Sequence, residues 1–170
     1  NNKKYNYTVH KLNPTKINNI TISSTIIRKF ICSNDIKFAN KLLGRNFLIK
    51  GMVTRGKGVG KKIKFPTANI KLLKKNTLIP GDGVYSVKVK VDNNIFIGMC
   101  NIGTRPTFYK DGEKVFEVHI ITDENLNLYN KNIIIEFQDF IRKEVKYESE
   151  AELIDQLYKD RSFCISNSII

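Results

Sequence analysis

The sequence predicts a mainly β protein: a small closed antiparallel barrel followed by a C-terminal helix and preceded by a short helical segment. Hydrophobic residues recur with the helical period of 3.6 before residue 44 and with a period of two from about residue 46. Turn-forming residues separate five or six short alternating stretches. A barrel is favoured over an open sheet because closure removes the exposed edges that so few strands would leave.

The chain has 170 residues, which fits one domain, or one domain plus a fragment. Its net charge is +13, but Lys outnumbers Arg 23 to 6, and Lys, Ile and Asn together make 66 of the 170 residues. This bias is typical of an AT-rich genome, and the basic residues are spread along the chain, so nucleic-acid binding is not favoured. No apolar run approaches the roughly 20 residues that span a bilayer, so we expect no membrane partner.

Three cysteines, Cys32, Cys100 and Cys164, lie far apart and form no C-x-x-C pair. Neither a zinc site nor a disulfide framework is indicated, and we expect reduced thiols in a cytoplasmic protein. The first ten residues lack the apolar stretch of a secretory signal. The chain begins at Asn1 rather than at Met, as a piece of a longer protein would.

Two helices are expected before the barrel. Ser23 or Ser24 can cap the first, Asn34 and Asp35 can open the second, and Gly44 ends it. The apolar residues expected to face inward are Ile26, Ile27, Phe30 and Ile31 in the first helix, and Ile36, Phe38, Ala39, Leu42 and Leu43 in the second. The boundary between this segment and the barrel is therefore placed near Gly44.

The strands follow from alternation and turns. The first has Phe47, Ile49, Gly51 and Val53 on one face; the next has Tyr85, Val87, Val89 and Val91, then a turn at 92–94 and a returning strand. Further strands are expected at 114–122 and 132–141. Ser149 and Glu152 form a capping box that opens the last helix, whose apolar stripe comprises Leu153, Ile154, Leu157 and Tyr158.

A cationic loop with three glycines lies just before Pro66. Gly56, Gly58 and Gly60 leave backbone amides open to an anion, and neighbouring lysines add positive charge. The spacing matches neither the P-loop nor the dinucleotide-binding fingerprint. By composition alone, an ordinary mobile turn is the commoner interpretation.

Thr67 and Asn69 follow Pro66 at the start of a strand, where residues two apart face the same side. A hydroxyl and an amide oxygen suit Mg²⁺, which takes its other ligands from phosphate and water. The alternative is an ordinary polar strand face.

Three further side chains are candidates for chemistry. Glu117 and His119 share one face of their strand, opposite the apolar Phe116, Val118 and Ile120, so Glu117 is a candidate general base beside a polar pocket. A solvated strand face is the alternative. Arg142 ends a strand, where it can hold an anion or a planar ring, or lie on the surface as a charge.

The order of these motifs is more specific than any one of them. The stretches "RGKGVGKKIKFPTANI", "IPGDGVYSVKV", "CNIGTRPTF", "FEVHI" and "IRKEVKYESEAELIDQLYKD" together resemble the riboflavin kinase module of bacterial bifunctional riboflavin kinase/FMN adenylyltransferases, from about Phe47 to Asp160. The resemblance implies a six-stranded antiparallel Greek-key barrel with a C-terminal helix. It also implies Mg²⁺-dependent transfer of the ATP γ-phosphoryl group to the riboflavin 5′-hydroxyl, giving FMN and ADP.

The resemblance also implies a role for each candidate residue. Thr67 and Asn69 would bind Mg²⁺ and ATP phosphate oxygens, and Glu117 would accept the proton of the ribityl hydroxyl. The other ATP-binding residues would be Gly56, Gly58, Gly60, Lys61 and His119. Arg142 and Tyr147 would border the flavin.

The N-terminal stretches "ISSTIIR" (22–28) and "ANKLLGR" (39–45) resemble the end of the adenylyltransferase module of the same enzymes. We therefore expect residues 1–44 to be the C-terminal remnant of that module and residues 45–170 to be the kinase domain. The module's H-x-G-H motif is missing, since the histidines here are His10 and His119. The chain looks like a C-terminal piece of the bifunctional enzyme or a truncated relative.

Two other functions stay open at this point. The full-length protein could also convert FMN to FAD through an upstream domain, or the chain could be a non-catalytic barrel that binds nucleic acid or flavin.

Four positions depart from the family pattern: Lys61 stands where Arg is usual, Lys64 and Asn130 where Gly is usual, and Ile26 where Arg is common. If the backbone at Lys64 has the positive φ that glycine allows, a lysine there is strained, whereas Asn130 tolerates a left-handed conformation well.

Overall fold

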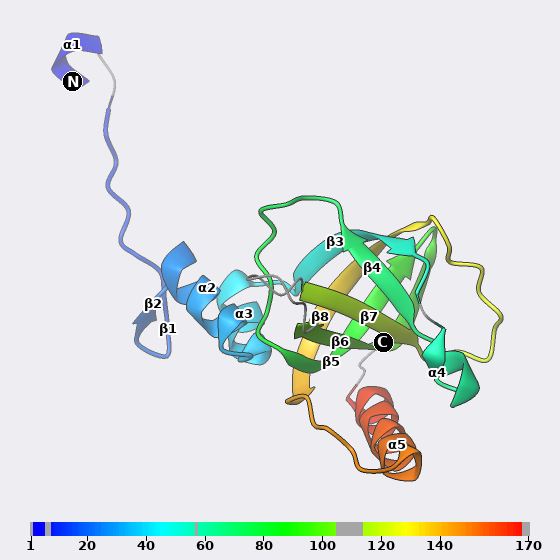
Figure 1. The fold of residues 1–170 in the computed structure, drawn as a ribbon. Helices are drawn as coiled ribbons and strands as arrows, with labels where there is room; N and C mark the ends of the chain where they lie inside the picture. The colour runs from blue at the N-terminus through cyan, green and yellow to red at the C-terminus, as the bar shows by residue number, and fades with distance from the viewer. Residues whose placement is uncertain (1, 6–7, 57, 105–113, 168–170) are drawn as a thin grey trace.

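The computed structural model describes residues 2–5, 8–56, 58–104 and 114–167. Its centre is a closed barrel, with a pair of helices beside one end and a long C-terminal helix against a different part of its outer surface (Figure 1). The barrel strands are β3 (Phe47–Thr54), β4 (Ala68–Leu72), β5 (Gly83–Val91), β6 (Asn94–Thr104), β7 (Lys114–Ile120) and β8 (Asn132–Arg142). The other elements are α1 (Asn2–Tyr5), β1 (Lys16–Ile17), β2 (Ile20–Thr21), α2 (Ser24–Cys32), α3 (Ile36–Leu43), α4 (Val59–Lys62) and α5 (Glu150–Ser166).

The strands follow one another around the barrel in the order β3-β4-β7-β6-β5-β8, and every neighbouring pair is antiparallel. Strands β5, β6 and β7 form a meander, and β8 returns to lie beside β5, which is the Greek-key arrangement. The predicted fold class is therefore confirmed. Its register places Glu117 of β7 opposite Asn69 of β4 on one side and Asn101 of β6 on the other.

The barrel interior is filled by the apolar residues that the alternation predicts. Ile49, Val53, Tyr85, Val87 and Val89 are buried, and so are Phe116, Val118 and Ile120 of β7. Phe65, Met99 and Cys164 form a second apolar cluster, which includes Leu157 of α5. Because the interior is packed, a binding site has to lie on the outer face of the strands or under the loops and helices that cover it.

The two helices before the barrel form as their caps predict. Ser23 Oγ accepts a hydrogen bond from the amide of Ile26 at 3.3 Å, and Asp35 Oδ1 accepts one from Phe38 at 3.2 Å. Gly44 ends α3 with a left-handed φ of 68°. The buried faces of these helices, through Ile31, Ile36 and Ala39, belong to the same apolar cluster as the barrel interior. The helical segment and the barrel thus share one core, and the assignment of residues 1–44 to another module stays a prediction.

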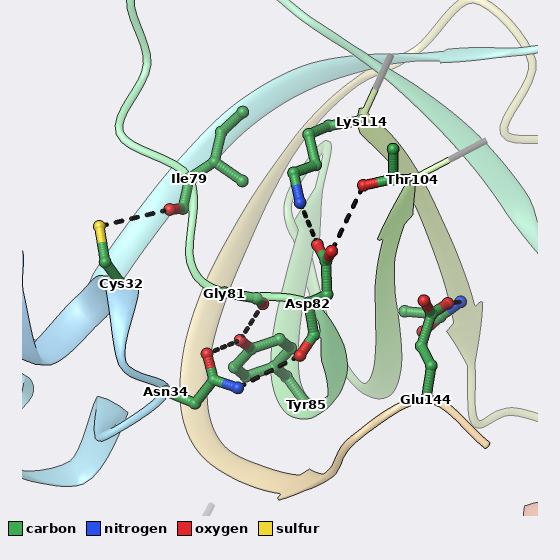
Figure 2. A network of polar contacts seen from close by, with 10 residues as sticks. Cys32, Asn34, Ile79, Gly81, Asp82, Tyr85, Thr104, Lys114 and Glu144 are labelled. Atoms are coloured by element: carbon green, nitrogen blue, oxygen red, sulfur yellow. Dashed lines mark hydrogen bonds and ion pairs between the residues drawn. The ribbon is translucent and has the colours of Figure 1, made fainter. Parts of the chain in front are cut away.

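A polar network fixes the turn between α2 and α3 to the barrel (Figure 2). The Tyr85 hydroxyl lies 3.0 Å from Asn34 Oδ1 and within hydrogen-bond distance of the Gly81 carbonyl oxygen, and Asn34 Nδ2 donates to the Asp82 carbonyl oxygen at 3.2 Å. A Cβ atom at Gly81 would lie 2.0 Å from Asn34 Oδ1, so only glycine allows this approach. Burial raises the pKa of the Tyr85 phenol far above its ordinary value, so the hydroxyl stays protonated and can donate.

Helix α5 begins as predicted but buries a different set of residues. Ser149 Oγ accepts from the amide of Glu152 at 3.2 Å, whereas the Glu152 carboxylate accepts from Glu148 rather than from Ser149. The buried residues of α5 are Asp160 and Cys164. Of the predicted apolar stripe, Leu153 and Leu157 are half-buried, whereas Tyr158 is 48% exposed. None of the helices in the described ranges is long and apolar enough to cross a membrane.

Candidate functional site

Two cavities lie outside the barrel strands, next to each other. The larger has a volume of about 730 Å³ and the smaller a volume of about 390 Å³. Phe65, Thr67 and His119 line both, so these residues form a shared wall. Helix α5 contributes to each, with Tyr158 and Arg161 at the larger cavity and Leu153 and Leu157 at the smaller. Molecules bound in the two cavities would therefore meet at the shared wall.

The smaller cavity has an apolar lining with a few polar groups. Glu117 is one of them: it is half-buried on the outer face of β7, as the alternation predicts. Arg142 and Tyr147, expected at the flavin, line the same cavity. The structure therefore brings together Glu117, Thr67, Arg142 and Tyr147, although they are spread over 81 positions of the sequence, from 67 to 147.

Asn101 and Glu144 also line the smaller cavity and were not predicted from the sequence. Asn101 Nδ2 donates to Glu144 Oε1 at 2.9 Å, while Asn101 Oδ1 is buried without a hydrogen-bond partner among the described residues. A Cβ atom at Gly103 would lie 2.4 Å from Glu144 Oε1, so the carboxylate packs directly on the backbone there. The β6–β7 register sets Asn101 opposite Glu117, and the loop after β8 brings Glu144 to Asn101.

Arg142 does more than line a cavity, because it anchors α5. Its Nε lies 3.1 and 3.0 Å from the two Asp160 carboxylate oxygens, and its Nη2 donates to Oδ2 at 2.8 Å. Its Nη1 donates to the Lys143 carbonyl oxygen at 3.1 Å, and its guanidinium lies 5.8 Å from the centre of the Tyr147 ring. The Asp160 side chain is fully buried and also accepts from Gln156 Nε2 at 2.8 Å. Most of the Arg142 donors are thus engaged within the protein.

The glycine loop lies between Asn69 and the larger cavity. Gly56 and Gly58 line the larger cavity, and Gly60 lines the smaller. A Cβ atom at Gly56 would lie 2.0 Å from Asn69 Nδ2, and one at Gly60 would lie 2.1 Å from the Phe65 carbonyl oxygen. Close packing on the backbone therefore requires glycine at position 60, whereas a side chain at position 56 would displace that of Asn69. The side chain of Lys61 lies outside the described part of the structure.

Lys64 has a φ of +62° and Asn130 a φ of +61°, so both residues that replace the usual glycine have the left-handed backbone considered above. Lys64 lines the larger cavity. A left-handed conformation costs an ordinary residue roughly 1–2 kcal/mol, which makes Lys64 a strained position beside the cavity.

Thr67 and Asn69 are placed differently with respect to the cavities. Thr67 is exposed and lines both, whereas Asn69 is half-buried in β4, against Gly56, and lines neither. Among the described residues, nothing forms a hydrogen bond with either side-chain oxygen, so both remain available to a ligand. A hydroxyl and an amide oxygen are hard donors of the kind that Mg²⁺ accepts, and the pair therefore fits the predicted metal.

His119 is buried on the shared wall and held in one tautomer. Its Nδ1 lies 2.9 Å from the Pro66 carbonyl oxygen, which can only accept, so Nδ1 carries the proton and Nε2 presents a lone pair. Burial lowers the pKa of His119, and the positive charge of Arg161 lowers it further, against the opposite effect of the Pro66 hydrogen bond. The ring is therefore neutral at pH 7.

The lowered pKa predicts a loss of stability in mild acid. Below the ordinary histidine pKa of about 6.5, the unfolded chain binds a proton that folded His119 resists, so the free energy of unfolding falls as pH falls through this range. Urea denaturation at pH 7.5 and 5.5 measures the effect, and His119→Gln should reduce the difference between the two. An equal pH dependence in both proteins would show that His119 is not its source.

Comparisons with known proteins show to which family the chain is similar. A family model described as riboflavin kinase matches residues 43–166. The bifunctional riboflavin kinase/FMN adenylyltransferase of Buchnera aphidicola subsp. Acyrthosiphon pisum is 44% identical over 159 residues, which are 92% of this chain and 50% of that protein. The Bacillus subtilis protein of the same name is 39% identical over 145 residues, 85% of this chain and 46% of its own.

Among solved structures, one described as a macrolide-efflux protein from Streptococcus pneumoniae matches with a TM-score of 0.85 and 37% identity, over 91% of this chain and 50% of that one. The chain thus spans about half the length of the curated relatives it matches. The family model covers well over half of this chain, including every residue of the shared wall. By sequence, the chain belongs to the riboflavin kinase family.

Proposed function

We propose that this chain transfers the γ-phosphoryl group of ATP to the 5′-hydroxyl of riboflavin in a Mg²⁺-dependent reaction, giving FMN and ADP. The observation that carries the proposal is the wall shared by the two cavities, with Thr67 on it and Glu117 beside it. Phosphoryl transfer depends mainly on holding two substrates in contact, and two adjoining cavities provide that arrangement.

The smaller cavity suits the flavin and the larger one the nucleotide. The smaller has the size and the mostly apolar lining of a site for a planar organic ligand, with polar groups at Glu117, Asn101 and Glu144. The larger is bordered by the glycine loop and by basic side chains, which suit a triphosphate. In this orientation the ribityl chain extends toward Thr67 and meets the γ-phosphate there.

Glu117 then acts as the general base. Its carboxylate accepts the proton of the 5′-hydroxyl as the ribityl oxygen forms its bond to the γ-phosphorus, and the bond from that phosphorus to the β–γ bridging oxygen breaks, releasing ADP. Thr67 and Asn69 would hold Mg²⁺, which supplies neutralisation of phosphate charge when bound. His119, which lines both cavities, would lie near the nucleotide.

The direct test is to mix the purified chain with riboflavin, ATP and Mg²⁺ and to identify the product by mass spectrometry. We expect FMN and an equal amount of ADP. Folded protein that forms no FMN would contradict the proposal. If it instead gave a salt-sensitive mobility shift with single-stranded nucleic acid, the result would favour a binding barrel.

Removing either candidate metal ligand should change the metal requirement. Thr67→Ala and Asn69→Ala each delete one oxygen donor, so the Mg²⁺ or ATP concentration needed for half-maximal rate should rise about tenfold. Mg²⁺ titrations at saturating riboflavin measure this, and Thr77→Ala, at a half-buried position outside both cavities, is the matched control. An unchanged Mg²⁺ dependence in both variants would show that these two residues do not form the metal site.

We further propose that residues 1–44 are the end of an adenylyltransferase module and that the full-length protein also makes FAD. The relatives named above are bifunctional, and this chain matches about half of each. The gene sequence upstream of Asn1 decides the matter: an H-x-G-H motif in a nucleotide-binding domain would support the proposal, and its absence would contradict it. The cytoplasmic location stays a prediction.

A further inference from the structure

Arg161 is a basic residue of the larger cavity to which neither the motifs nor the comparisons assign a role. It lies in the C-terminal half of α5, is half-buried and lines the cavity wall. Two other cations line the same cavity, but Arg55 lies over the Tyr129 ring at 5.0 Å and Lys64 is exposed to solvent. Arg161 is thus the cation most withdrawn from water among these three.

Within the described part of the chain, the guanidinium of Arg161 forms no hydrogen bond and no ion pair. The adjacent carboxylate, Asp160, is already saturated by Arg142 and Gln156 on the side of the smaller cavity. A partly buried charge without a partner is costly, and arginines in such places normally bind a carboxylate or a phosphate. The position therefore suits a bound anion.

The surroundings of Arg161 place it near the shared wall. Its charge contributes to the lowered pKa of His119, whose ring contacts Phe65 and whose Nδ1 donates to the Pro66 carbonyl oxygen. Tyr158, one helical turn before Arg161, also contacts the Phe65 ring, with the ring centres 5.1 Å apart. Arg161 thus lies at the end of the larger cavity that is nearer to Thr67. The acidic residues of this cavity, Asp123 and Glu124, come from the exposed segment after β7.

We propose that Arg161 binds phosphate oxygens of ATP in the larger cavity, an inference that rests on the proposed kinase function. Its planar guanidinium can donate two parallel hydrogen bonds to a phosphate, which a lysine cannot do. Arg161 would thereby supply a bidentate phosphate contact of the kind lost where Lys61 replaces arginine in the glycine loop. The adjacent Asp160 accepts a hydrogen bond from Arg142, which lines the smaller cavity, so neighbouring residues of α5 are linked to both sites.

The test separates nucleotide binding from flavin binding. Arg161→Gln should raise the KM for ATP roughly tenfold or more, as expected for loss of a charge-assisted bidentate contact, with kcat and the KM for riboflavin close to those of the wild type. Arg161→Lys should recover only part of the loss. Lys159→Gln removes the same charge from an exposed position on the same helix and should leave both KM values unchanged.

Calorimetric titration with Mg²⁺-ADP gives a second measurement that needs no turnover. Arg161→Gln should weaken the affinity for Mg²⁺-ADP by a similar factor. An unchanged KM for ATP together with unchanged ADP affinity would overturn the inference. So would an equal loss of riboflavin and nucleotide binding, because that would indicate a structural role in α5. If wild-type chain makes no FMN, the kinase proposal fails, but the ADP titrations still decide whether Arg161 binds phosphate.

Discussion

Glu117→Gln is expected to lower kcat by about 10²-fold or more while leaving riboflavin affinity nearly unchanged. Glutamine keeps the size of the side chain and a hydrogen-bonding oxygen, but it cannot take the proton of the 5′-hydroxyl. The strand register should hold the replacement in place, since position 117 is paired on both sides, with Asn69 and with Asn101. Loss of turnover without loss of binding is the signature of a group that acts in the transition state.

Two measurements check this expectation: FMN formation by chromatography, and riboflavin binding by quenching of flavin fluorescence. Glu150→Gln, the same substitution at an exposed position in the first turn of α5, is the control and should behave as wild type. Turnover of Glu117→Gln within a few-fold of wild type would exclude Glu117 as the base. Loss of flavin binding along with turnover would assign it to substrate binding instead.

Arg142→Met should lower the free energy of unfolding by roughly 3–5 kcal/mol, the largest stability effect that we expect in this chain. The substitution leaves the Asp160 carboxylate fully buried, with Gln156 as its remaining donor. Replacing both partners, as in Arg142→Met with Asp160→Leu, should recover much of the loss because no charge is then left alone in the interior. Urea denaturation of the three variants and the wild type measures these differences.

The pair between Lys37 and Asp139, whose lysine is exposed, provides the control for this series. Lys37 Nζ and Asp139 Oδ2 are 2.7 Å apart, about as close as the Arg142–Asp160 pair, but the Lys37 side chain is 68% exposed. Lys37→Met should therefore change stability by less than about 1 kcal/mol. A loss of similar size in Arg142→Met would show that the Arg142–Asp160 pair contributes little. A double variant no more stable than Arg142→Met would show that the effect comes from lost packing rather than from the uncompensated charge.

The barrel is well predicted because the sequence patterns that indicate it involve only neighbouring residues. Alternation at Tyr85, Val87 and Val89 requires only neighbouring residues, and so do the caps at Ser23 and Ser149. The positive φ at Lys64 follows from a motif that usually has glycine at that position. The elements that were missed, α1, β1 with β2, and α4, have two to four residues each, too few to show a period.

The candidate site is less predictable because its parts meet only through the fold. Glu117 could be identified from the sequence because apolar residues alternate with it along its strand. Asn101 and Glu144 could not, because only the strand order and the loop after β8 bring them to the site. Asp160 and Arg161 are charged residues of an exposed-looking helical segment, and no periodic pattern indicates that one is fully buried and the other lines a cavity. Identifying them requires knowing which strands α5 covers.

The core shared by α2, α3 and the barrel has a consequence for how such a domain can move between genes. A recombination event that cut at Gly44 would strip Ile31, Ile36 and Ala39 from the apolar cluster they share with the barrel, and it would leave Tyr85 without Asn34. The inherited barrel would then expose an apolar face to water. We therefore expect this barrel to be exchanged with less loss of stability when the transferred segment begins near Ser23 and includes the two helices.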